Sequence, residues 1–182
     1  MSDQRQLGVD LFNEAWRLIE TREDDDRLLH VTHASRYHWG EAEECKPENL
    51  ARGEWLVSRV YTVLGRPEPA IWHARRCLEH CDANGIGDWD LAYAYEALGR
   101  AHALAGDGEA EQWKAKAREA GDAIADPEDR EHFDEDYATF LTGSDPAPRE
   151  RLLCNGTVTA RSTSPANCVD RLLSPSHIRD GV

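Results

Sequence analysis

One pattern occurs twice in this sequence, as Val57-Ser58-Arg59-Val60-Tyr61-Thr62-Val63-Leu64-Gly65 and, loosened, as Leu98-Gly99-Arg100-Ala101-His102-Ala103-Leu104-Ala105-Gly106. In each copy, apolar residues recur at helical spacing, the helix stops at a glycine, and a short polar turn leads into a second helix that contains alanine. The two closing glycines lie 41 residues apart. A recurring unit of this length indicates stacked helix pairs, which are typical of a binding surface.

The whole first part of the chain fits this interpretation, so we expect an all-α array of antiparallel helix pairs with about seven helices. No segment alternates with period two, which argues against a sheet. Capping residues, glycines and prolines place the helices at about 5–20, 24–39, 48–64, 67–83, 89–105, 108–124 and 127–141. Thr21 with Asp24 resembles a capping box for the second helix, and Asp88 is expected to cap the fifth. Residues 1–144 would form one domain.

The C-terminal part, residues 145–182, has a different composition. It contains no Phe, Trp or Tyr and many Ser, Thr, Pro, Asn and Gly residues, so we expect a low-complexity, mostly disordered tail with one short helix near 169–173. Five arginines and four acidic residues give this tail a charge of +1 and leave −15 on residues 1–144.

Charge and cysteine usage limit the classes of partner and the compartment. The net charge of −14 argues against nucleic acid and anionic membranes as partners. The first residues show no basic region followed by an apolar stretch, and no apolar run has the length of a membrane span. Five cysteines, an odd number, favour reduced thiols. We therefore expect a cytoplasmic protein.

The helix-pair pattern resembles the tetratricopeptide repeat. The matching positions in the better unit are Leu98-Gly99, His102, Gly106, Ala110 and Ala117, and in the unit before it they are Val57-Ser58, Tyr61, Gly65, Ala70 and Cys77. In the N-terminal helix pair only Ala15 and Ala34 occupy positions that match the repeat pattern. The units exceed the usual length of about 34 residues, so the longer-helix variants of the family fit better. The stretch 5–142 is also similar to bacterial tetratricopeptide-like proteins of uncharacterised function.

The resemblance implies a site. In this family the first helices of successive pairs line a concave groove that holds a partner segment. Projected onto that geometry, two stripes with the spacing i, i+3 and i+7 would face the groove: Arg52, Trp55, Arg59 and Tyr93, Glu96, Arg100. Arginines beside aromatic rings suit a carboxylate or an acidic segment. The alternative is that Trp55 and Tyr93 belong to the core and the arginines pair with local acids.

Histidines and cysteines on two second helices suggest a weaker possibility. The repeat aligns His30 with His73, so a zinc site from His30, His33, His73 and Cys77 is conceivable. However, neither half has the close cysteine spacing of a structural zinc site, and buried cysteines with repeat-aligned histidines at a helix seam explain the pattern adequately. We predict no metal and no cofactor.

Motifs for catalysis are absent. There is no serine flanked by glycines at an elbow, and Gly85-Ile86-Gly87-Asp88 is too short for a phosphate loop and lacks the following lysine. An enzyme is therefore the less expected class. We expect a protein- or peptide-binding adaptor, regulator or assembly partner. The alternative is a small-molecule or metal-binding protein, conceivably an enzyme, that uses the His, Cys and Arg residues. A third alternative is a homodimer formed through Phe12 and Trp16 of the first helix.

Overall fold

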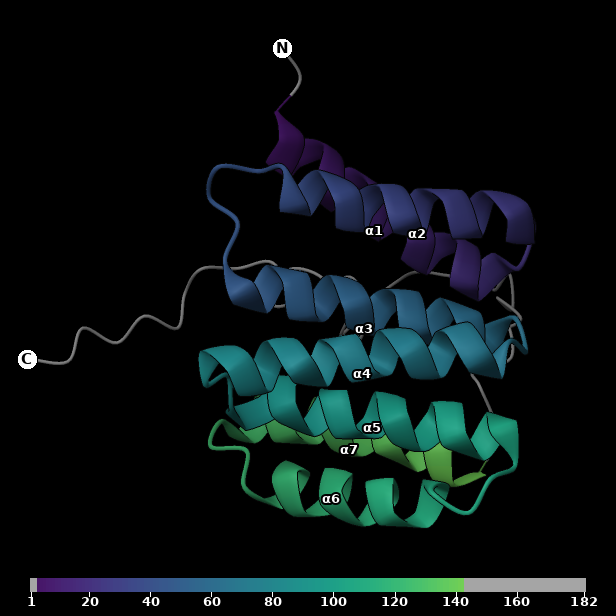
Figure 1. The fold of residues 1–182 in the computed structure, drawn as a ribbon, viewed down its shortest axis with the longest axis vertical. Coiled ribbons are helices and arrows are strands. Elements are labelled where there is room, and N and C mark those ends of the chain that lie inside the picture. The colour runs from purple at the N-terminus through teal and green to yellow at the C-terminus, as the bar shows by residue number, and fades with distance from the viewer. Residues whose placement is uncertain (1–2, 143–182) are drawn as a thin grey trace, which may run out of the picture.

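The computed structural model describes residues 3–142, and these residues form a stack of α-helices (Figure 1). The helices are α1 (Gln4–Thr21), α2 (Asp25–Gly40), α3 (Pro47–Val63), α4 (Pro67–Asn84), α5 (Asp88–Ala105), α6 (Ala110–Asp122) and α7 (Pro127–Thr142). The all-α prediction is confirmed, no strand occurs among the described residues, and each helix ends within two residues of its predicted limits. The tail prediction for 145–182, including the short helix near 169–173, lies outside the described residues.

Local signals set most helix ends. Asp3 precedes α1 and accepts a hydrogen bond from the Arg5 backbone N–H at 2.9 Å. Asp24 does the same for α2 by accepting from the Arg27 N–H at 2.8 Å. Gly106 ends α5 with φ = +67°, a conformation that a residue without a Cβ adopts easily.

Asp88 does not cap α5, contrary to the prediction. Gly87 takes the capping position, and Asp88 is the first helical residue, with φ = +53°. The Asp88 Oδ1 instead accepts a hydrogen bond from the Ala125 N–H at 3.2 Å. Its carboxylate therefore holds the connection between α6 and α7 rather than the start of its own helix.

Consecutive helices form antiparallel pairs, α1 with α2, α3 with α4 and α5 with α6, and the pairs stack on one another (Figure 1). The two middle first helices, α3 and α5, are enclosed: residues 53–60 and 96–102 are buried without interruption. Small side chains allow close approach, since Ala74, Ala92 and Ala117 are fully buried. Ser58 also donates a hydrogen bond to the Ala70 carbonyl at 2.9 Å, which joins α3 to α4.

The last helix, α7, packs against α5 and α6 at the C-terminal end of the array. The Phe133 ring is fully buried and occupies the space that a side chain at Gly121 of α6 would need. The Tyr137 hydroxyl donates to the Lys114 carbonyl of α6 at 3.0 Å. No helix among the described residues has the length and apolar character that crossing a membrane requires.

The contact between Phe133 and Gly121 generates a stability prediction. A Cβ at Gly121 would collide with the Phe133 ring, so Gly121→Ala should lower the free energy of unfolding by about 1–3 kcal/mol, measured by urea denaturation. Gly108→Ala is the control, because nothing lies within 4 Å of a Cβ at Gly108. Helix propensity alone would make Gly121→Ala stabilising by about 1 kcal/mol, so a gain in stability would contradict the packing.

Candidate functional site

The structure brings the six predicted groove residues together on the adjoining faces of α3 and α5. Five of them are buried, with exposed fractions of 2–8%, and the Arg52 side chain is 17% exposed. The Trp55 indole N–H donates to the Glu96 carboxylate at 3.4 Å, and the Trp55 and Tyr93 rings meet edge to face with centroids 5.4 Å apart. The two stripes are therefore in direct contact.

Arg52 forms a bidentate ion pair across the two helices. Its Nε and Nη2 atoms each donate to the Asp90 carboxylate at 2.8 Å, and its guanidinium lies 4.4 Å above the Trp89 ring. Burial raises the pKa of Asp90 above its ordinary value, although the Arg52 charge acts in the opposite direction. The fork geometry that would suit a partner's carboxylate is thus used by Asp90.

Arg100 lies in a second polar network, which also includes α7. Its guanidinium pairs with Glu96 and donates to the Asp136 carbonyl at 2.6 Å and to the Thr139 hydroxyl at 2.8 Å. The Tyr93 hydroxyl donates to the Asp136 carboxylate at 2.8 Å. The predicted arginine therefore meets internal acceptors, which is the arrangement that the alternative interpretation of the sequence described.

Asp136 is the acidic centre of this network. Burial raises the pKa of its carboxyl, although the Tyr93 hydroxyl favours the charged form. The charges of Arg59 and Arg100 also favour the charged form. Arg59 is itself only 8% exposed, so both arginine side chains lie inside the protein beside this carboxylate.

An aromatic column runs behind the polar groups, with one ring from each of four helices. Trp16 of α1 lies 5.8 Å from Trp55 of α3, Trp55 lies 5.4 Å from Tyr93 of α5, and Tyr93 lies 5.3 Å from Phe133 of α7. Trp16 and Phe133 were not among the residues predicted for this face. Their spacing of 38–40 residues from one ring to the next is the signal that would have identified them.

A separate charged cluster lies where α2, α3 and α4 meet. The buried Glu54 carboxylate of α3 accepts from Arg36 Nε at 3.0 Å and hydrogen bonds to His73 Nδ1 at 2.7 Å, and Arg76 Nε lies 3.7 Å away. Burial alone would raise the pKa of Glu54, but the His73 hydrogen bond and the Arg36 charge outweigh it and hold that pKa below its ordinary value. The His33 Nε2 hydrogen bonds to the Tyr61 hydroxyl at 2.9 Å.

The conceivable zinc site is assembled only in part. His33 and His73 have ring centroids 5.5 Å apart, but His30 is highly exposed beside Asp26. Cys77 is buried, and its hydrogen bond to Cys81, together with burial, raises the pKa of its thiol well above the ordinary value. Among residues 3–142 no group of three or more His, Cys, Asp or Glu side chains is placed to hold a metal ion.

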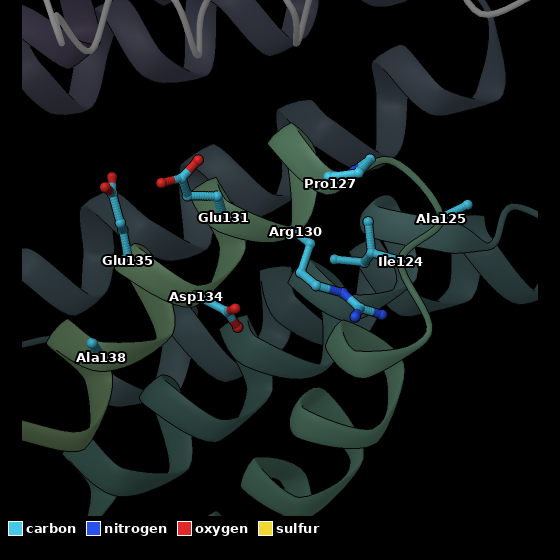
Figure 2. A pocket seen from close by; sticks show the side chains of 8 residues that line it. All are labelled: Ile124, Ala125, Pro127, Arg130, Glu131, Asp134, Glu135 and Ala138. Carbon is cyan, nitrogen blue, oxygen red and sulfur yellow. The ribbon is translucent and has the colours of Figure 1, made fainter.

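An open hollow of about 630 Å³ lies along α7 and its preceding turn (Figure 2). Its lining residues are Ile124, Ala125, Pro127, Arg130, Glu131, Asp134, Glu135 and Ala138. Glu131 and Glu135 project in the same direction from the helix in Figure 2. The hollow is therefore acidic along one wall, and it contains none of the six predicted residues.

No family model, curated protein or solved structure matches this chain. The resemblance to the tetratricopeptide repeat therefore stays a prediction that depends on the quoted residues.

The histidine pair predicts a pH dependence of stability. Burial and the neighbouring His73 lower the pKa of His33, although Glu54 acts in the opposite direction. The unfolded chain then binds the His33 proton more tightly than the folded one, so the free energy of unfolding should fall as pH drops below about 6.5. Urea denaturation at several pH values between 7.5 and 5.5 should show a shallower slope for His33→Gln than for the wild type.

His30→Gln is the matched control on the same helix, because His30 is 80% exposed and should leave the slope unchanged. Equal slopes for His33→Gln and the wild type would show that His33 is not held neutral by its surroundings.

Proposed function

We propose that the protein is a protein- or peptide-binding scaffold, an adaptor, regulator or assembly partner in the bacterial cytoplasm, whose partner lies along the first-helix face. The supporting observation is that two stripes of the same spacing, one on α3 and one on α5, lie against each other with aromatic rings and paired charges side by side. Arg, Trp and Tyr are the residue types that dominate binding energy at interfaces.

The energetics of the charged groups favour a role in recognition. Burying an ion pair costs desolvation energy, and apolar side chains of similar volume often stabilise a fold equally or better. The aromatic column also joins the helix pairs, so these buried charges are not the sole contact between them. A partner segment could exchange its own polar groups for these internal ones, which would give specificity without exposed charges.

A small-molecule-binding protein is the alternative, and one arrangement favours it. Glu54, His73 and His33 gather at the seam of three helices, with a carboxylate that orients the His73 imidazole. Native mass spectrometry of the purified protein separates the classes, because a bound metabolite or metal would add a defined mass, whereas a peptide-binding scaffold would show the mass of the chain alone.

The proposed function is tested with a variant that removes the Glu96–Arg100 ion pair and replaces both residues by side chains of similar volume. Glu96→Gln combined with Arg100→Met takes away both members together, which spares the fold the cost of an unpaired buried charge. Affinity purification from the native host, with quantitative mass spectrometry, should recover at least about tenfold less of the specific partner with this variant than with the wild type.

The matched control is Lys116→Gln, which removes an exposed cation of α6 that lies 4.3 Å from the Trp113 ring, away from the charge pair. Circular dichroism must show that both variants are folded. Undiminished recovery of every partner by the folded double variant would refute the proposed site.

A further inference from the structure

One histidine of α4 has a fixed proton position. His73 hydrogen bonds through Nδ1 to the Glu54 carboxylate at 2.7 Å. Glu54 is only 4% exposed and also accepts from Arg36 Nε at 3.0 Å, and these contacts keep its carboxylate charged. A charged carboxylate only accepts hydrogen bonds, so the His73 proton lies on Nδ1 and the lone pair lies on Nε2.

The Nε2 atom of His73 is open to solvent. Within residues 3–142 it has no hydrogen-bond partner and is not enclosed by protein atoms, and the side chain is 13% exposed. The ring is held in place, because it stacks on Tyr61 with centroids 5.7 Å apart and meets the Trp72 ring edge to face at 4.6 Å. An unprotonated nitrogen that is oriented by a carboxylate and reaches the surface is a nucleophile.

His102 of α5 provides a comparison within the same protein. Its Nδ1 also pairs with a carboxylate, that of Asp107, at 2.7 Å. However, its side chain is 2% exposed, and its Nε2 is buried. Among residues 3–142 these two are the only histidines whose Nδ1 hydrogen bonds to a carboxylate, and His73 alone combines this contact with an open Nε2.

We propose that His73 is a phosphorylation site, where Nε2 accepts a phosphoryl group from an N-phosphoryl donor. The site lies outside the first-helix face and goes beyond the proposed function. A phosphoryl group would add between one and two negative charges where α2, α3 and α4 meet, as phosphorylation does at a hydroxyl, so it would change the surface that the scaffold presents there.

The transfer step involves no change of oxidation state. The Nε2 lone pair attacks phosphorus, the phosphorus–nitrogen bond of the donor breaks, and the amine leaves with the proton that it already carries in the donor. The Nδ1 proton stays between the ring and Glu54. The charge of Glu54 offsets the positive charge that the ring acquires, so the same contact both directs Nε2 toward the donor and stabilises the product.

The experiment incubates the untagged full chain with potassium phosphoramidate near neutral pH. Peptide mass spectrometry under alkaline conditions, which preserve phosphohistidine, gives the rate at each histidine, and phosphorus NMR distinguishes Nε2 from Nδ1 adducts. His73 should be modified on Nε2 at least about tenfold faster than the exposed His30 and the buried His102. Glu54→Gln should slow the reaction at least about tenfold, because an amide can donate to Nδ1 and move the proton to Nε2.

Asp107→Asn is the matched control, since it removes the corresponding carboxylate of His102 and should leave the rate at His73 unchanged. Circular dichroism must show that both variants are folded, and if Glu54→Gln is not, the rates at His73, His30 and His102 of the wild type decide alone. Equal rates at His73 and His30, modification on Nδ1, or an unchanged rate in folded Glu54→Gln would each overturn the proposal.

Discussion

The array depends on the contact that Trp55 makes with its two neighbouring pairs. In a stacked array each unit touches only the adjacent units, so continuity requires one well-packed contact at every junction. Trp55 of α3 meets Trp16 of α1 on one side and Tyr93 of α5 on the other, and its indole N–H reaches Glu96. Burial of a large ring contributes about 1.5–3 kcal/mol, and an aromatic pair adds about 0.5–1.5 kcal/mol. Loss of this one side chain would therefore weaken two junctions together.

The enclosure of α3 and α5 explains where the polar groups lie. Residues 53–60 and 96–102 have no solvent-facing side, so a charged residue in either run must find its partner inside the protein. Glu54 of α3 hydrogen bonds to Arg36 and His73. Arg100 of α5 pairs instead with Glu96 and donates to a carbonyl of α7. The same local geometry thus creates two polar clusters of different composition on the two faces of the array.

The sequence specifies the helices better than it specifies their charged partners. Asp24 and Gly106 act within a few residues of their own positions, so capping and left-handed turns predict the ends of α2 and α5. Asp88 is the exception, because its carboxylate accepts a hydrogen bond from the N–H of Ala125, which lies 37 residues away in the sequence. Repeat phase predicted that Arg52, Trp55 and Tyr93 share one face of the array, but the partners Asp90 and Asp136 come from separations of 38 and 43 residues. Periodicity shows which face a side chain occupies, and only tertiary packing shows which acid it meets.

The buried arginines already have acidic partners inside the protein. On the first-helix face, Arg52 donates to Asp90, and Arg100 donates to Glu96 and to groups of α7, so a binding segment would compete with these internal acceptors. Such an exchange favours a segment that carries both donors and acceptors, as a peptide backbone does. At the junction of α2, α3 and α4, Arg36 likewise donates to an internal carboxylate, that of the buried Glu54. The acidic partners that the arginine stripes suggest are therefore supplied within the protein, by Asp90, Glu96 and Glu54.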